Sequence, residues 1–529
     1  MALMAPAKNT AIAILMCVVI SLFLFFELKP SLETPDISAD EGLSYSTTVF
    51  LMNNVSENPF HWKEVVFFGR HYPLTSNGWN HGALESYLIF PAVKIFGIHL
   101  WSLRIIPIFF GVLIIILTYA VGSRLFSPAV GLISSSLLAL NPFYITAVKL
   151  GPSLGFSLPM FSLIALLSLW KYLKTEKNQF LYLTAFSLGV GLNAKGFFVW
   201  FIIGFLLSTL FCYWNVLRRI KYKSIGLTAL VFFIGAFPAL CFYYSSSVMR
   251  IVAHSGAHAT YLGHDNLRIL ENLIVRLKQL RFILGGEKWE NLFSINFPVV
   301  LFWLSFFYIA RLIIFGEMSP EKKQIRHLFL IILFVATTST FSFTGLWRVH
   351  WCILMPYLQF LIAVAMVEIF KLRNSLSRVF VSTCLILLLT CYSNLLILRY
   401  HQHSLEKKSS GTCSIGALTR WLIDNKYSEP VSFDPNVHFG LRIFSGLKMC
   451  NRETICWPDE KDAREIIYRS LSQPNNGRVF IASYIRPQQK VNVFIQFSLE
   501  ELKKKMVIVK DFTDPDTGKL RFRVFGVTD

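Results

Sequence analysis

Apolar segments of roughly 16 to 22 residues recur along most of this 529-residue chain. A helix of that length spans the hydrocarbon core of a bilayer with modest tilt. Hydrophobic residues make up 54% of the chain, an excess that a soluble domain of this size does not carry. The pattern therefore predicts an α-helical polytopic membrane protein. We expect spans at residues 10–28, 103–122, 128–147, 153–172, 180–194, 197–216, 225–244, 295–314, 327–344, 350–369 and 379–398.

One further apolar segment, 83–98, contains Glu85 and Lys94 and is interrupted by Pro91, so it could span the membrane or lie in the interface as a helix. Charge favours the second alternative. If 83–98 does not cross, all the strong basic clusters between spans fall on one side, together with Lys8, as the positive-inside rule requires. We therefore predict about eleven spans plus one interfacial helix. The clusters are Lys171/Lys174/Lys177, Arg218/Arg219/Lys221/Lys223, Lys322/Lys323/Arg326 and Lys371/Arg373/Arg378.

The same rule accounts for the formal charge of +20, which in a soluble protein would suggest a nucleic-acid partner. Here the cations gather between apolar segments, so no nucleic acid is expected. The apolar run 11–26 resembles a signal peptide, but Glu27-Leu28-Lys29-Pro30 ends it in place of a small-residue cleavage site. We interpret this run as a retained first span.

The predicted topology divides the chain into a transmembrane core, 1–399, and an extracytoplasmic α/β domain, 400–529. Within the core, the first loop, 29–102, and the loop 245–294 lie on the extracytoplasmic face. The turns at 148–152, 193–196 and 345–350 share that face. Without an internal repeat, a transporter built from inverted repeats has little support.

Short β-rich runs in the C-terminal domain alternate with helical patterns, which predicts a small α/β fold. Asp514-Pro515-Asp516-Thr517-Gly518 reads as a turn between the last two strands. Cysteines 413, 450 and 456 could supply one disulfide in an oxidising compartment, whereas those inside apolar segments are packing residues. The expected strands are 431–433, 478–483, 506–510 and 520–525, with a helix at 459–471.

Asp40 and Glu41 form an adjacent carboxylate pair just after the first predicted span. A carboxylate near an apolar boundary has a raised pKa tendency and could accept a proton from an acceptor hydroxyl. The alternative is a solvated pair, with Asp40 as the N-cap of a helix that continues to residue 52. The local sequence leaves both open.

Lys195 lies between two apolar runs in the segment GVGLNAKGFFVWF. A lysine there could extend its ammonium group to lipid headgroups, or it could bind a phosphate, with Gly196 allowing the backbone to approach the anion.

Arg348 and His350 stand in another predicted extracytoplasmic turn, beside Trp347 and Trp351. They could belong to an aromatic belt or face a phosphate group, and His81, before the interfacial segment, could act with them or be structural.

The loop 245–294 contains His254, His258, His264 and Asp265, which could hold a divalent metal but match no compact ligand signature. A mobile polar loop that covers the site is the favoured interpretation, and no cofactor is assigned. The chain has no P-loop, no Rossmann glycine pattern and no GxSxG in a strand–turn–helix context, so ATP-driven transport and serine hydrolysis have no support.

Taken together, the chain resembles the C-type polyprenyl-phosphate-dependent glycosyltransferases, the bacterial relatives of protein O-mannosyltransferases and of the lipid A aminoarabinose transferase. The resemblance covers roughly the first 220 residues and, more weakly, 340–370. The stretches that carry it are ADEGLSY, HGALESYLIFPAVKIFGIHLWSLRIIP, SRLF, LLALNPFYITAVKLGPS and GLNAKGFF.

The resemblance implies an active site on the periplasmic or lumenal face, a polyprenyl-phosphate sugar as donor, and inversion at the anomeric carbon. It implies that Asp40 is the catalytic acidic position, with Glu41 its neighbour, and that Lys195 contacts the donor phosphate. It further places His81, Arg348 and His350 near that phosphate. A lipid, glycan or protein would be the acceptor.

The chain departs from the family pattern in two places, and both concern the acceptor more than the reaction class. The corner at 150–156 offers Lys149 and Ser153 where the family often has an acidic residue, and Leu43 and Ser44 stand where an arginine often follows the acidic pair. We predict an integral multi-pass protein of the bacterial inner membrane, with the C-terminal domain in the periplasm. The alternatives are an oligosaccharide ligase or polymerase and a lipid flippase or transporter.

Overall fold

The computed structural model forms two compact units, each described separately below. Unit 1 comprises Met1–Leu28, Trp79–Glu85 and Pro107–Arg399, and unit 2 comprises Lys29–Gly78, Ser86–Ile106 and Tyr400–Asp529. The structure describes residues 5–28, 39–53, 64–76, 82–149, 151, 155–244, 268–285, 297–315, 319–341, 348–371, 379, 381–385, 415–427, 429–432, 435–445, 478–483, 506–513 and 520–527.

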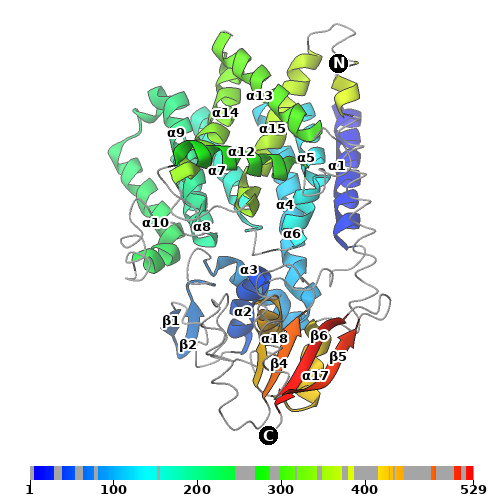
Figure 1. The fold of residues 1–529 in the computed structure, drawn as a ribbon. Helices are drawn as coiled ribbons and strands as arrows, with labels where there is room; N and C mark the ends of the chain where they lie inside the picture. Colours follow the sequence, from blue (N-terminus) through cyan, green and yellow to red (C-terminus); the bar gives the residue numbers. More distant parts are fainter. Residues whose placement is uncertain are drawn as a thin grey trace. The chain divides into compact units, whose positions relative to one another are not determined.

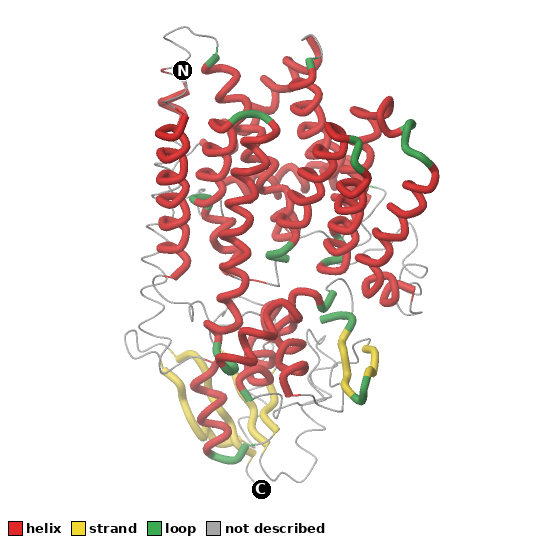
Figure 2. The backbone as a smooth tube through the Cα atoms, turned by 180° about the vertical axis from the view of Figure 1, so that it is seen from behind, coloured by secondary structure: helices red, strands yellow, loops and turns green. Residues whose placement is uncertain are grey.

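Unit 1 is helical in its described part, and its long helices lie side by side in both views (Figures 1 and 2). The predicted spans that fall on described residues overlap helices, whose apolar side chains face either neighbouring helices or the outer surface. The helices are α1 (Ala5–Leu28), the larger part of α4 (Leu100–Leu125), α5 (Pro128–Ala139), α6 (Pro142–Lys149), α7 (Leu158–Thr175), α8 (Asn178–Ala194), α9 (Phe198–Leu217), α10 (Tyr222–Tyr244), α12 (Ile269–Gly285), α13 (Phe297–Phe315), α14 (Pro320–Thr338), η3 (Ser339–Phe341), η4 (Arg348–Leu354) and α15 (Met355–Phe370).

Among the described residues, five helices are long and apolar enough to cross a membrane, or six when a bent pair is counted as one span. The predicted fold class, a membrane protein with a helical core and a small C-terminal sheet, is confirmed. The count of about eleven spans stays a prediction. Most of the expected span at 379–398 lies outside the described residues.

The predicted span at 128–147 consists of two helices, α5 and α6, which meet at a bend of 64° and together are long and apolar enough for one broken span. Pro142 lacks the amide proton that a continuing helix needs. The side-chain oxygen of Asn141 accepts a hydrogen bond from the backbone N–H of Tyr144 at 3.0 Å and so caps α6. The chain therefore restarts a helix in a new direction at this point.

Two glycines allow α8 and α10 to approach closely. A Cβ atom at Gly189 would overlap the carbonyl oxygen of Phe232, and one at Gly235 would lie 2.8 Å from the carbonyl oxygen of Phe186. Small residues at a helix crossing are a common way to pack helices in a bilayer. The contact fixes α8, whose C-terminal end carries Lys195.

The predicted loop 245–294 contains a helix, α12, in its described part, and the mobile stretch expected around His254, His258 and His264 lies outside the described residues. Asn272 and Arg276 are buried in α12 and hydrogen-bond the carbonyl oxygens of Thr340 and Ser339, each at 3.4 Å. These bonds connect the helix to the end of α14 and to η3.

Unit 2 contains a four-stranded sheet of order β3-β4-β6-β5, in which β3 and β4 are parallel and the other neighbours are antiparallel. The four predicted strands are confirmed, whereas the predicted turn at 514–518 and helix at 459–471 lie outside the described residues. The elements are α2 (Ala39–Asn53), β1 (Glu64–Phe67), β2 (Arg70–Pro73), most of α3 (Leu84–Phe96), the start of α4, α17 (Ile415–Asp424), β3 (Glu429–Ser432), α18 (Pro435–Phe444), β4 (Arg478–Ser483), β5 (Met506–Thr513) and β6 (Leu520–Val527).

Aromatic contacts pack α17 on this sheet. The ring of Trp421 lies 5.8 Å from that of Phe512 in β5, and Phe512 lies 6.4 Å from Phe522 in β6. On the same strand pair, Arg523 donates two hydrogen bonds of 2.7 Å to Asp511. The functional division predicted at residue 400 stays a prediction.

Candidate functional site

Lys195 ends α8, and its backbone adopts an extended conformation that turns the chain toward α9. Its side chain is completely buried, and its Nζ atom lies 5.2 Å from the centroid of the Phe197 ring. A buried ammonium group is unfavourable unless charges or ligands compensate it. A charged Lys195 side chain therefore requires an opposite charge or an anionic ligand close to it.

Glu85, in the first turn of α3, supplies an opposite charge. Its Oε1 atom accepts hydrogen bonds from the backbone N–H and the hydroxyl of Ser157, at 3.0 and 2.7 Å. Burial raises the pKa of Glu85 to about 7, and the Lys195 ammonium and the Ser157 bonds oppose that rise. The stem of Lys195 packs against Gly155, where a Cβ atom would lie 3.1 Å from the lysine Cδ.

The segment before α3 contacts the chain directly at the turn between α8 and α9, where Lys195 lies. Gly82 donates a backbone hydrogen bond of 3.2 Å to the carbonyl of Ala194, and a Cβ atom at Gly82 would overlap the carbonyl oxygen of Asn193. Glycine is needed at that position for this close approach. His81, which precedes Gly82 in the sequence, lies outside the described residues, so its predicted role stays a prediction.

The 3₁₀ helix η4 reaches the same cluster. Its buried Cys352 interacts electrostatically with both Lys195 and Glu85. Arg348 and His350 begin this helix, but their side chains lie outside the structural description. Elements that are distant in the sequence thus converge on Lys195 within unit 1, whereas the predicted grouping of Lys195 with His81, Arg348 and His350 stays a prediction. The phosphate contacts themselves stay predictions.

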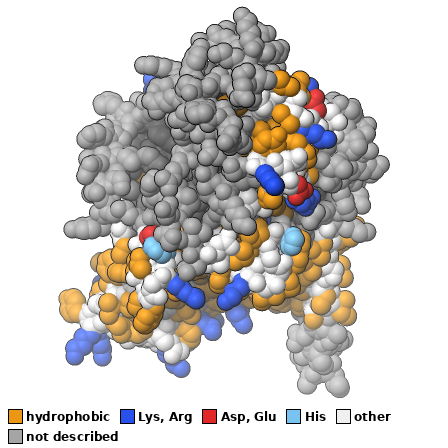
Figure 3. Space-filling view, turned by 90° about the horizontal axis from the view of Figure 1, so that it is seen from below, with side chains coloured by type: hydrophobic (Ala, Val, Ile, Leu, Met, Phe, Trp, Pro, Cys, Tyr) orange, Lys and Arg blue, Asp and Glu red, His pale blue; other side chains and the backbone are white. Residues whose placement is uncertain are grey.

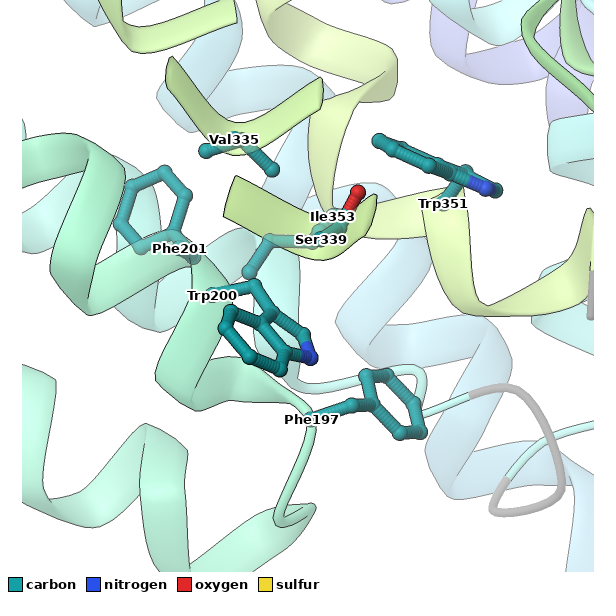
Figure 4. A pocket seen from close by; sticks show the side chains of 7 residues that line it. All are labelled: Phe197, Trp200, Phe201, Val335, Ser339, Trp351 and Ile353. Carbon is teal, nitrogen blue, oxygen red and sulfur yellow. The ribbon is translucent and has the colours of Figure 1, made fainter. Parts of the chain in front are cut away.

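A small aromatic recess with a volume of about 20 Å³ adjoins this cluster through Phe197 (Figure 4). Its wall also contains Ser339, the first residue of η3, and Trp351. The indole of Trp351 donates a 2.7 Å hydrogen bond to Gln279. Gln279 in turn accepts a 3.1 Å bond from the buried Arg276. The lining residues are Phe197, Trp200, Phe201, Val335, Ser339, Trp351 and Ile353.

The acidic pair belongs to unit 2. Asp40 lies in the first turn of α2, and its side chain is outside the described part. Glu41 is completely buried and is held by Arg104 of α4 through three hydrogen bonds of 2.9 to 3.1 Å. This bidentate geometry fixes the carboxylate and neutralises it. The catalytic roles of Asp40 and Glu41 stay predictions.

The weak metal candidates His254, His258, His264 and Asp265 lie outside the described residues. In the part of the chain that the structure describes, no group of three or more metal-ligating side chains occurs.

Sequence reasoning did not assign Glu85, Arg104 or Arg276 to a site. A signal existed for the first two: Glu85 is the one acidic residue in 83–98, and Arg104 is the one charged residue in 100–122. Isolated charges in apolar segments indicate functional or paired groups. Their partners could not be found, because Ser157 and Glu41 are 72 and 63 residues away.

Comparison with known proteins finds a similarity to one family over part of the chain. Residues 80–242 match the family model described as dolichyl-phosphate-mannose-protein mannosyltransferase. The matched segment contains Glu85, Arg104, Ser157 and Lys195. A search of curated protein sequences finds no match.

Solved structures share the fold. ArnT from Cupriavidus metallidurans, bound to undecaprenyl phosphate, superposes with a TM-score of 0.60 at 13% identity, over 98% of each chain. The oligosaccharyltransferase AglB from Archaeoglobus fulgidus, in complex with an inhibitory peptide and a dolichol-phosphate, gives a TM-score of 0.53 at 13% identity, over 98% of this chain and 74% of AglB. With the family match, this fold confirms the predicted resemblance.

Proposed function

We propose that this chain transfers a sugar, with inversion, from a polyprenyl-phosphate-linked donor, and the match of residues 80–242 to the mannosyltransferase family model supports this proposal. The acceptor is a lipid, glycan or protein at the extracytoplasmic face of a bacterial inner membrane. The observation that carries the proposal is a buried cation, Lys195, inside the family-matched segment and beside an aromatic recess.

Lys195 is the proposed phosphate ligand. A buried ammonium group attracts an anion strongly because little water screens it. Glu85 and the Phe197 ring stabilise the cation and hold it at the turn between α8 and α9. When the lipid phosphate binds, its negative charge compensates part of the positive charge of Lys195. Glu85 keeps its two hydrogen bonds to Ser157.

The aromatic recess next to Phe197 has a volume of only about 20 Å³, so its apolar side chains could contact the part of the donor next to the phosphate but not enclose it. Six of its seven lining side chains are aromatic or aliphatic. Because the lipid chain already lies in the hydrocarbon of the bilayer, such contacts would stabilise the complex by van der Waals packing rather than by the hydrophobic effect. Arg276, behind Ser339 and Gln279, adds positive potential near the recess.

The reaction needs one base and a stabilised leaving group. The acceptor hydroxyl oxygen attacks the anomeric carbon while the bond from that carbon to the phosphate oxygen breaks. The lipid phosphate leaves with the electron pair, and the hydroxyl proton passes to Asp40. Because positive side chains stabilise the departing phosphate, no general acid is required. Glu41, neutralised by Arg104, positions this part of α2 rather than acting as the base.

The test uses the purified full-length protein and mass spectrometry of the lipids that copurify with it. A polyprenyl phosphate or its glycosylated form should accompany the wild type and Asp40→Asn, and should be depleted in Lys195→Met. Lys174→Met is the matched control, since Lys174 is exposed on α7. Absence of any such lipid from the wild type would refute the proposed donor.

Turnover distinguishes an enzyme from a transporter. In liposomes that contain a radiolabelled lipid-linked sugar, together with membrane extract as acceptor, the wild type should move label into a product and Asp40→Asn should not. If Asp40→Asn behaved like the wild type, transport or another site would replace the proposed reaction.

A further inference from the structure

A hairpin in unit 2 exposes a contiguous apolar tip. Strands β1 and β2 pair antiparallel, Phe67 lies opposite Arg70, and Phe68 and Gly69 form the two-residue turn. The exposed fraction rises toward the turn, from 48% at Val65 and 56% at Val66 to 60% at Phe67 and 90% at Phe68. Four consecutive large apolar side chains at the surface require an apolar environment or a partner.

The turn itself retains phenylalanine at an unfavourable position. Phe68 has φ +48° and Gly69 has φ +70°, the left-handed conformations of a hairpin turn that favours Asn-Gly. A bulky side chain in this region is strained, and such strain is a signal of function. The Phe67 and Phe68 rings contact each other edge to face at 4.3 Å, so they present one apolar surface.

The base of the hairpin is braced, so its tip has a defined position within the unit. His71 bridges back to Glu64 across the strands at 2.9 Å. Tyr87 of α3 donates a 2.9 Å hydrogen bond to the carbonyl of Pro73, at the end of β2. The exposed side chains therefore sit on a supported strand pair.

The charged residues beside the hairpin tip indicate which environment surrounds it. Arg70 is exposed directly after the turn. Aromatic side chains at the glycerol level with a cation at the phosphates are typical of protein segments in the bilayer interface. The end of α3 has the same combination, with Ile95 and Phe96 exposed by 73% and 51% next to the exposed Lys94. Figure 3 likewise shows hydrophobic side chains interspersed with lysine and arginine on the described surface.

We propose that the hairpin tip, residues 65–70, inserts its apolar side chains into the bilayer interface and places Arg70 at the lipid phosphates. The chain is already anchored by membrane helices, so a bilayer is continuously within reach of the unit. Apolar side chains at an interface reach roughly 5–10 Å below the headgroups. The hairpin is thus a second, non-helical membrane contact, independent of the proposed sugar transfer.

The experiment replaces Phe68 with the photoreactive p-benzoylphenylalanine in the full-length protein, reconstituted in phosphatidylcholine vesicles with or without phosphatidylglycerol. Two matched positions serve as controls: Phe237, exposed on the membrane helix α10, and Val507, exposed on β5 of unit 2. After irradiation, mass spectrometry identifies the adducts. Lipid adducts are expected at positions 68 and 237 and not at 507.

Arg70→Gln sharpens the result. It should lower the lipid adduct at position 68 in vesicles with phosphatidylglycerol and leave the adduct at position 237 unchanged. An unchanged yield at position 68 would overturn the assignment of Arg70 to the lipid phosphates. If position 237 labels lipid while position 68 labels none, or labels a peptide of this or another protein, the insertion itself is refuted.

Discussion

Two buried acid–base arrangements, one in each unit, differ in how firmly the cation is held. In unit 2, Arg104 grips both oxygens of Glu41 through its planar guanidinium group. In unit 1, two hydrogen bonds to Ser157 fix Glu85, and Lys195, a flexible point charge, packs over the Phe197 ring. The first geometry is that of a structural pair, whereas a lysine can shift its ammonium group toward an arriving anion.

This difference predicts that the Glu41–Arg104 pair contributes mainly to the stability of the fold, whereas Lys195 contributes mainly to ligand binding and turnover. Removing one partner of a rigid buried pair leaves an uncompensated charge, so stability should fall. Removing the lysine from a compensated pocket should chiefly affect the anion that the pocket binds. Substitution of Lys195 should therefore lower turnover, whereas substitution of Glu41 or Arg104 should lower the stability of the fold.

The two largest expected effects are losses of turnover, and the first of them is caused by Lys195→Met. Loss of one preorganised charge at a developing anion lowers the rate by about 10²–10³-fold, and Lys195→Arg should restore part of it. Transfer of radiolabelled sugar from the lipid donor measures this effect. If Lys195→Met and the exposed-site variant Lys174→Met had the same activity, Lys195 would have no part in the reaction.

Asp40→Asn should lower kcat by about 10²–10⁴-fold, because an amide cannot accept the acceptor's proton. Binding of the donor lipid should stay as in the wild type. Glu41→Gln gives the contrast on the neighbouring residue: its main effect should be a lower unfolding temperature. A larger loss of kcat in Glu41→Gln than in Asp40→Asn, at equal stability, would exchange the roles of the two carboxylates.

Arg104→Met should destabilise the protein by about 3–5 kcal/mol, since Glu41 would stay buried without its partner. The double variant Glu41→Leu/Arg104→Met should recover much of this loss, because neither charge remains. Thermal unfolding of the detergent-solubilised protein measures both. Equal unfolding temperatures for Arg104→Met and the wild type would show that the pair does not stabilise the fold.

The smallest effect, a change of several-fold, concerns pH and Glu85. With a pKa of about 7, its carboxyl group is mostly neutral below that pH and becomes charged above it. The charged form competes with the lipid phosphate for Lys195, so donor affinity should fall between about pH 6 and 8. Lys195 and Cys352 are the titratable groups that interact with Glu85 in the described part of the chain.

Glu85→Gln keeps an oxygen for the Ser157 hydrogen bonds and should remove this pH dependence. The sign for stability agrees: a folded pKa above the ordinary 4.5 means that the folded state keeps a proton that the unfolded state has lost. Stability from this group is therefore full below about pH 4.5 and is lost as the pH rises toward 7. A pH profile that stays the same in Glu85→Gln would assign the dependence to another group.

The sequence was sufficient for the apolar helices and for the strands of the C-terminal sheet, because apolar length and alternation are local signals, but it predicted neither α12 nor the hairpin of β1 and β2. Residues 478–483 form a strand and 180–194 lie in α8 as predicted. The break at Asn141–Pro142 was also local, yet the apolar run on both sides concealed it. What the sequence could not supply was pairing over distance.

Lys195 was singled out from its apolar neighbours, but its counter-charge Glu85 was not. Glu85 comes from another helix, and its hydrogen-bonding partner Ser157 follows it by 72 residues. Arg104 likewise finds Glu41 only in the folded chain. The family resemblance did not identify these partners either, because a sequence motif specifies residue types but not the contacts between distant residues.

The most direct test of the central claim is the equilibrium affinity of the full-length protein for undecaprenyl phosphate, measured by native mass spectrometry in the wild type and in Lys195→Met. We predict that Lys195→Met binds the lipid at least about tenfold more weakly, equivalent to about 1.4 kcal/mol, while Arg104→Met binds it as the wild type does. Equal affinity of the wild type and Lys195→Met would contradict the assignment of Lys195 as the phosphate ligand.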